Sequence, residues 1–317
     1  MRLSGYHPRY FPRQAASACL VLLLLTAAGK VWAQARRPGD APPAYLQGKP
    51  DQEQGRKILE EFRRTGWSLG GTYYLEFELR VLPRRGDERT VPGRMWGGRG
   101  AVGPVSLIVL QPGVKDAERR LLVHVGPESK AWSWPPEVGA PAAGSVAELG
   151  PAALFRPLAG TDLTAFDLQM PFIYWPDFLF EGVSPVLGDR PANTFLLLPP
   201  AAIAALRPEL TGVRVWLDGQ YNALLKAEQL GRDGRPLKSV EVRDLKEVSV
   251  RSDGNPSGGQ WIVKVVDVRD EATRDKTQFV VTAAAVGLDP DATFFTPEHL
   301  AGPLVPPPAS RVQRFGR

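Results

Sequence analysis

The chain has 317 residues, of which 43% are hydrophobic, and its 39 Lys and Arg residues outnumber its 34 Asp and Glu residues to give a formal net charge of +5. Residues 1–35 hold four of the basic residues and none of the acidic ones, so the rest of the chain carries 39 − 4 = 35 basic against 34 acidic residues, a net charge of +1. This balance gives no electrostatic reason to expect a nucleic-acid partner. Cys19 is the only cysteine, which excludes disulfides and thiolate metal sites after residue 35.

Residues 1–35 have the pattern of a secretory signal peptide. Basic residues up to Arg13 precede the uncharged stretch 14–29 with its apolar centre at 20–25, and the small residues of 33–35 suit signal peptidase. A retained membrane anchor is the alternative, but the uncharged stretch is shorter than the roughly 18 to 20 residues that span a bilayer. We therefore expect cleavage of this segment and a periplasmic protein.

The first element expected after the signal peptide is an amphipathic helix. Asp51 offers an N-cap, and the apolar residues Ile58, Leu59 and Phe62 recur at helical spacing. Glutamate and basic residues four positions apart occupy the opposite face. The pattern predicts a helix over 52–65.

Alternation of apolar and polar residues then predicts a β-strand at 73–81. Tyr73, Leu75, Phe77 and Leu79 share one face, while the charged residues between them share the other. Further strands are expected at 90–96, 105–110, 119–125, 213–218, 223–230, 236–250, 261–268 and 278–282, and a short helix at 200–206. Tight-turn residues at 231–234 and 252–256 favour antiparallel pairing. We expect one mainly β domain, a curved antiparallel sheet with a few helices and loops covering its concave face.

The segment 171–180 has the most unusual composition of the chain. It is apolar and aromatic, its only charge is Asp177, and its two prolines predict an irregular loop. Two interpretations remain open, because such a loop either fills the concavity of the sheet as a core plug or acts as a lid over a hydrophobic ligand. The tryptophans of 132–134 pose the same choice, and there core packing is favoured.

Motifs that would indicate an enzyme, a cofactor or a metal are weak. Residues 98–103 match a dinucleotide fingerprint, but Pro104 and a strand follow where a helix should begin, so we expect a glycine-rich hairpin or bulge. His124 and His299 have no further metal-ligating residues near them in the sequence at a spacing typical of a metal site. Four acidic residues are better explained as caps and loop hydrogen-bond acceptors than as paired catalytic carboxylates: Asp162, Asp167, Asp177 and Glu181. We expect a protein that is not an enzyme and needs neither cofactor nor metal.

Several short motifs occur in an order that resembles a known family. They are residues 55–62 of the predicted helix, the Trp-Ser-Trp-Pro of 132–135, and the segments 160–168, 215–218 and 224–228. In this order they are similar to the LolA/LolB-like outer-membrane lipoprotein-sorting proteins. The resemblance implies an open antiparallel β half-barrel whose hydrophobic concave face is closed by helices. We therefore divide the chain into a signal peptide (1–35), a Pro-, Ala- and Gly-rich linker (36–50), a LolA/LolB-like lipid-carrier domain (51–302) and a disordered tail (303–317).

The resemblance also implies a function. Members of the family carry acyl chains of lipoproteins across the periplasm, so it implies lipoprotein acyl chains or another lipid as ligand, with an inner-membrane donor complex and an outer-membrane acceptor as partners. This chain is longer than the small carriers, has the additional aromatic segment and lacks a lipid-anchoring cysteine. The alternative is a non-transporting periplasmic sensor or interaction module of the same fold, which binds a peptide or a membrane-anchored partner. The candidate ligand-binding residues, in the cavity or its lid, are Phe62, Tyr73, Leu75, Phe77, Leu79, Phe172, Tyr174, Trp175, Phe178 and Phe180.

Overall fold

A computed structural model describes residues 49–65, 71–100, 103–135, 145–187, 190–220, 223–252, 255–290 and 293–316. All of them belong to one compact unit, Tyr45–Arg317. The predicted signal peptide and most of the predicted linker lie outside the described residues.

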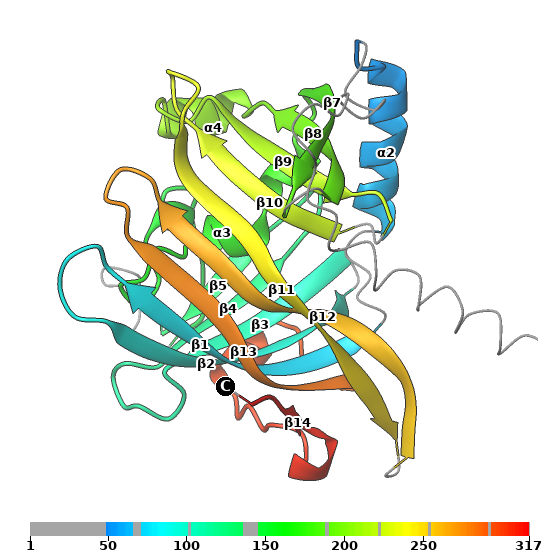
Figure 1. Cartoon of the computed structure of the whole chain (residues 1–317). Helices are drawn as coiled ribbons and strands as arrows, with labels where there is room; N and C mark the ends of the chain where they lie inside the picture. Colours follow the sequence, from blue (N-terminus) through cyan, green and yellow to red (C-terminus); the bar gives the residue numbers. More distant parts are fainter. Residues whose placement is uncertain are drawn as a thin grey trace, which may run out of the picture. The chain divides into compact units, whose positions relative to one another are not determined.

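The unit is built on one antiparallel sheet with fourteen strands in the described part of the chain (Figure 1). The strands are β1 (Thr72–Leu82), β2 (Arg89–Gly100), β3 (Gly103–Leu110), β4 (Arg119–His124), β5 (Ala131–Trp134), β6 (Ala147–Glu148), β7 (Phe178–Val186), β8 (Arg190–Leu197), β9 (Gly212–Asp218), β10 (Ala223–Leu230), β11 (Pro236–Ser252), β12 (Asn255–Asp270), β13 (Lys276–Leu288) and β14 (Gln313–Arg314). Their spatial order is β6-β5-β4-β3-β2-β1-β13-β12-β11-β10-β9-β8-β7, with β14 beside β13. Because β6 and β7 are the two edges of this order, the sheet is the predicted open half-barrel.

Side-chain alternation places the apolar residues of β1 on the inner face of the sheet. Phe77 and Leu79 are buried there, while Glu78 points to the other side and pairs with Arg80. Phe77 lies opposite Gly93 of β2. A Cβ atom added at Gly93 would lie 2.2 Å from Cζ of Phe77, so only glycine lets this ring lie across the neighbouring strand.

The predicted helix is confirmed as α2 (Gln52–Thr65), and the short one as α4 (Ala201–Leu206). Between β6 and β7 the chain forms η3 (Ala153–Phe155), α3 (Ala165–Gln169) and η4 (Pro171–Tyr174). Residues 149–175, which contain these three turns, are called the plug below. Thr164 and Asp167 close a capping box at the start of α3. No helix in the described residues is long and apolar enough to span a bilayer.

The irregular loop expected at 171–180 is only partly found. Its first half is the turn η4, which Pro171 can begin because the first helical position needs no N–H donor. Its second half enters β7 at Phe178. The sequence analysis also missed β5, β6, β7 and β8. Pro185 is tolerated in β7 because this strand is a sheet edge with one side free of ladder hydrogen bonds.

The predicted disordered tail is described up to residue 316 and contains ordered structure. β12 pairs with β13 only up to Val280, so the next part of β13 offers unpaired backbone groups, and β14 pairs there opposite Ala283 and Ala284. The guanidinium of Arg314 lies 2.8 Å from the carboxylate of Glu76. A sheet edge that needs a partner is the physical reason why this proline-rich segment is held.

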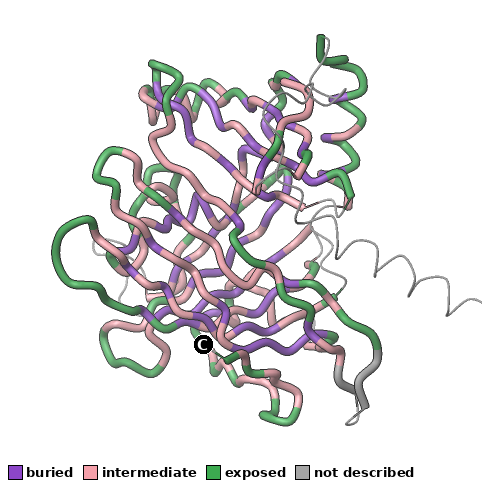
Figure 2. Tube along the Cα trace, viewed as in Figure 1, coloured by how far each residue is buried: buried purple, intermediate pink, exposed green. Residues whose placement is uncertain are grey.

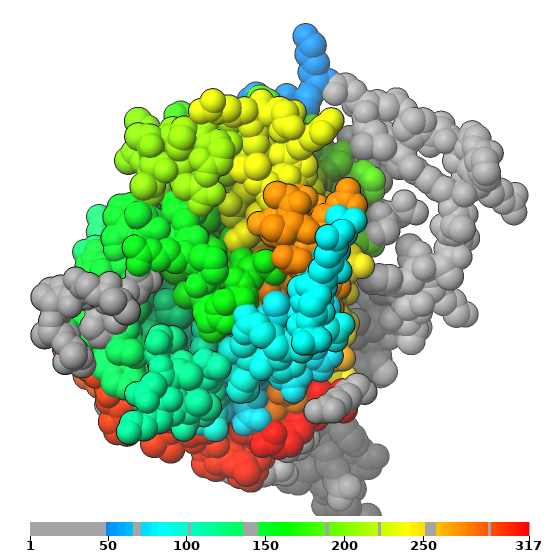
Figure 3. Space-filling view, turned by 90° about the vertical axis from the view of Figure 1, so that its left-hand side faces the viewer, coloured from blue at the N-terminus to red at the C-terminus, as the bar shows by residue number. Residues whose placement is uncertain are grey.

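Buried residues, purple in Figure 2, occur along most of the strands and form clusters on both faces of the sheet. On the inner face, the plug packs against β1–β4 through one cluster and against β7–β10 and α2 through another. In the space-filling view of Figure 3 the green atoms of the plug region are visible between the cyan and yellow strands. On the outer face, residues 294–312 pack over Tyr74, Trp96 and Leu122. The inner face is therefore the one that α2 and the plug cover.

Candidate functional site

The candidate residues of β1 lie where the alternation predicted. Leu75, Phe77 and Leu79 are buried on the inner face, and Tyr73 is partly buried. Phe77 and Leu79 share a cluster with Leu163 of the plug. The part of β1 that carries Phe77 and Leu79 thus faces the protein's own plug, whereas Leu75 and Tyr73 pack against residues of β11–β13.

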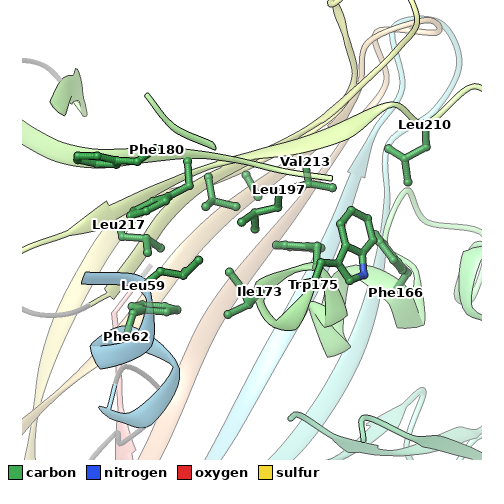
Figure 4. Packing of buried hydrophobic residues seen from close by; sticks show 14 residues of the cluster. Leu59, Phe62, Phe166, Ile173, Trp175, Phe180, Leu197, Leu210, Val213 and Leu217 are labelled. Carbon is green, nitrogen blue, oxygen red and sulfur yellow. The ribbon is translucent and has the colours of Figure 1, made fainter. Parts of the chain in front are cut away.

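The other candidate residues meet at the opposite half of the sheet, in the cluster shown in Figure 4. Phe62, Phe172, Trp175 and Phe180 are 1–5% exposed, while Tyr174 and Phe178 are partly buried against them. Side chains from α2, the plug and β7 therefore fill the concavity together, as the core-plug interpretation of 171–180 expects.

Two phenylalanines that the sequence analysis did not select lie at the centre of this cluster. The Phe166 ring lies 5.7 Å from Phe172 and 6.3 Å from Trp175, centroid to centroid. Phe195 of β8 lies 4.9 Å from Phe180. Phe166 belongs to the 160–168 motif, and Phe195 to an apolar run that could have indicated a buried strand.

α2 is attached to the rest of the unit by polar contacts at its two ends. At the start, the Gln52 side chain accepts from Phe180 N at 2.9 Å and donates to Phe180 O at 2.8 Å, as a neighbouring strand would. At the end, Arg63 donates to the carbonyls of Ile173 and Trp175, both at 2.7 Å. Burial lowers the pKa of Arg63 from its ordinary value. Between these contacts, Leu59 and Phe62 reach into the cluster (Figure 4).

The close approach of α2 to β7 depends on Gly55. A Cβ atom at this position would lie 2.4 Å from Cβ of Phe180, which no real side chain tolerates. The glycine in the 55–62 motif is thus explained by the packing distance between helix and sheet.

The plug is anchored by a buried polar network around Asp167, whose side chain is 1% exposed. Its Oδ2 accepts from Lys238 Nζ at 2.8 Å and from Thr164 Oγ1 at 2.7 Å, and its Oδ1 accepts from Gln229 Nε2 at 2.8 Å. Lys238 also donates to the carbonyl of Asp162 at 2.7 Å. These contacts attach the 160–168 motif to β10 and β11.

The expected roles of the acidic residues as caps and loop hydrogen-bond acceptors are confirmed for two of the four. Asp167 caps α3 and pairs with Lys238, while Asp162 Oδ2 accepts from Thr277 Oγ1 at 2.8 Å. Glu181 instead lies in β7 and forms an ion pair with Arg214 of β9 at 2.7 Å. Among the described residues, no group of His, Cys, Asp and Glu side chains is arranged to hold a metal ion.

A cavity of about 410 Å³ lies beside the end of α2. It is lined by Glu60, Arg63 and Arg64 of α2, by Arg99, Gly103 and Pro104 of the β2–β3 hairpin, by Val125, Gly126 and Pro127, and by Tyr174 of the plug. The sequence analysis did not select its three arginines, since arginines on a helix face or at a hairpin usually face solvent.

No protein-family model and no curated protein sequence matches the chain. Solved structures do match. An outer membrane lipoprotein-sorting protein domain from Vibrio parahaemolyticus is similar at 18% identity with a TM-score of 0.61, covering 79% of this chain and all of that one. A DUF1329 family protein from Desulfovibrio piger is similar at 17% identity with a TM-score of 0.59, covering 78% of this chain and 98% of that one. A LolA superfamily protein from Nitrosomonas europaea is similar at 15% identity with a TM-score of 0.51, covering 77% of this chain and 98% of that one. The unit therefore has the fold of the LolA-like lipoprotein-sorting proteins, as the order of its sequence motifs implied.

Proposed function

We propose that the protein is a periplasmic carrier that takes up acyl chains of lipoproteins or lipids on the inner face of its sheet and passes them toward the outer membrane. The observation that carries the proposal is an apolar inner face covered by a helix, α2, that is a separate element at the edge of the sheet. The similarity of the fold to a lipoprotein-sorting domain supports the same function. Export rests on the signal-peptide pattern of residues 1–35.

Acyl chains need such an apolar site. Each methylene group exposed to water costs roughly 0.8 kcal/mol, so a chain of about fifteen methylenes would cost about 12 kcal/mol. The cluster that α2 covers offers aromatic and aliphatic side chains from β7–β10 and the plug for this purpose. A chain that enters here replaces contacts that Leu59 and Phe62 of α2 make in the closed protein.

Competition between α2 and the ligand also explains how a carrier releases its load. The free energy needed to displace α2 lowers the apparent affinity for the acyl chain, because only molecules with α2 displaced bind it. A moderate affinity lets an acceptor withdraw the acyl chain. In this scheme an inner-membrane donor complex supplies the ligand and an outer-membrane acceptor receives it.

The test is a comparison of two adjacent arginines of α2. Arg63→Leu removes both hydrogen bonds to the plug, whereas Arg64→Leu removes only an exposed ion pair with Glu61. Stopped-flow measurements with the uncharged methyl ester of a fluorescent fatty acid should show association several-fold faster for Arg63→Leu, and wild-type rates for Arg64→Leu, because the loss of an arginine charge does not act on a neutral head group.

Native mass spectrometry of protein purified from the periplasm completes the test. A carrier should retain a copurified lipid. Absence of lipid, together with no binding of the fluorescent fatty acid by wild type or Arg63→Leu, would reject the carrier and favour the sensor or interaction module.

A further inference from the structure

The arginine-lined cavity lies at the seam between the two inner clusters. Tyr174 lines the cavity and packs against both the cluster on β1–β4 and the cluster around α2. Pro104 and Val125 give the cavity apolar walls on the side of the sheet. An acyl chain that entered between the clusters at Tyr174 would leave its head group in this cavity.

The charge of the lining is positive. Three arginines and one glutamate give 3 − 1 = +2, and Glu61, which lies outside the lining, pairs with Arg64 at 2.6 Å. Arg63 uses two of its five N–H donors on neutral carbonyls, so its charge is not neutralised by those bonds. Arg99 has no ion pair with any described residue.

We propose that this cavity holds the anionic head group, a carboxylate or a phosphate ester, of an acyl-chain ligand, so that the protein prefers anionic amphiphiles to neutral acyl esters. The inference rests on the proposed carrier function and narrows its ligand class. Guanidinium groups suit this role, since they bind carboxylate and phosphate oxygens through paired, charge-assisted hydrogen bonds. The apolar walls and Tyr174 then lead from the charged head to the buried clusters.

The experiment compares cis-parinaric acid with its methyl ester, two fluorescent probes that share one chain and differ in the charge of the head. The acid should bind mature wild-type protein about tenfold more tightly than the ester, and rising salt concentration should weaken the binding of the acid only. Arg99→Gln should remove most of this difference by lowering the affinity for the acid. Arg85→Gln, in the connection between β1 and β2, makes the same change of charge outside the cavity lining and should leave both affinities unchanged. Arg99→Lys should restore part of the preference.

Three results would overturn the inference. Equal affinities of acid and ester in wild type would reject the anionic head-group site and leave the carrier proposal standing. No binding of either probe would reject both. Displacement of the acid by micromolar inorganic phosphate would assign the cavity to a free anion instead, whereas an amphiphile site should retain the acid in millimolar phosphate. Circular dichroism would detect unfolding of Arg99→Gln. In that case the salt dependence of acid binding by the wild-type protein decides whether the cavity holds an anionic head group.

Discussion

The buried ion pair between Asp167 and Lys238 should hold the plug in place, and removing one partner should be costly. The Lys238 side chain is 14% exposed and that of Asp167 1% exposed. Asp167→Ala removes the only carboxylate with which this lysine is seen to pair among the described residues, and it leaves the Gln229 amide without the acceptor at Oδ1.

The expected loss is about 3–5 kcal/mol, because breaking a buried pair on one side leaves an uncompensated charge. That is a large part of a total stability of about 5–15 kcal/mol. Thr164→Ala, which removes the N-cap hydroxyl of α3 and keeps the ion pair, should cost only about 1 kcal/mol. The double variant Asp167→Leu with Lys238→Met removes both charges, so it should be markedly more stable than the summed losses of the single variants Asp167→Leu and Lys238→Met imply.

Urea unfolding of the mature protein, followed by circular dichroism and by tryptophan fluorescence, measures these differences. Trp175 lies 6.3 Å from Phe166 on α3, centroid to centroid, so one of the seven tryptophans after residue 35 reports on the plug. A loss below about 1 kcal/mol for Asp167→Ala, or strict additivity of the two single losses in the double variant, would refute the assigned role of the pair.

Four further predictions concern other parts of the unit. Phe77→Asp should destabilise by several kcal/mol and Glu78→Lys by less than about 1 kcal/mol in urea titrations, because the two side chains point to opposite faces. Gly55→Val should lower the melting temperature clearly more than a valine at an exposed α2 position, since its Cβ would meet Phe180. Burial lowers the pKa of His124, so stability should fall as pH drops below about 6.5 and level off below the folded-state pKa, and a glutamine there should flatten that part of a stability–pH curve. Hydrogen exchange should be faster in α2 than in α3.

Local sequence signals were sufficient for the elements with strong periodicity. The bounds of α2 and β10 agree with prediction, because an apolar stripe or a strict alternation over several residues defines them. β7 and β8 were missed, since Pro185 and Pro191 argue against a strand unless its place at or near a sheet edge is known. β14 was missed for a similar reason: its pairing depends on an unpaired part of β13 that lies about thirty residues earlier in the chain.

The candidate site divides in the same way. Alternation placed Phe77 and Leu79 on the inner face, and the structure confirms this. What lies against that face could not be read from the sequence, because the plug is anchored by contacts between distant residues, such as Asp167 with Gln229 and Lys238, 62 and 71 positions away. Patterns of neighbouring residues carry no information on such pairs. The same limit applies to the cavity, whose arginines come from α2 and from the β2–β3 hairpin.

The packing distinguishes the element that can open from the one that cannot. The plug buries five large apolar side chains, Leu163, Phe166, Phe172, Ile173 and Trp175. Burial of each stabilises the fold by about 1.5–3 kcal/mol, so exposing all five to water would cost about 8–15 kcal/mol. That equals the stability of a whole domain, so a protein without its plug in place is unfolded. α2 buries only two side chains, Leu59 and Phe62, which contribute about 3–6 kcal/mol on the same scale, besides its polar contacts. An acyl chain worth about 12 kcal/mol offsets that loss, and α2 therefore suits the role of lid better than the segment 171–180.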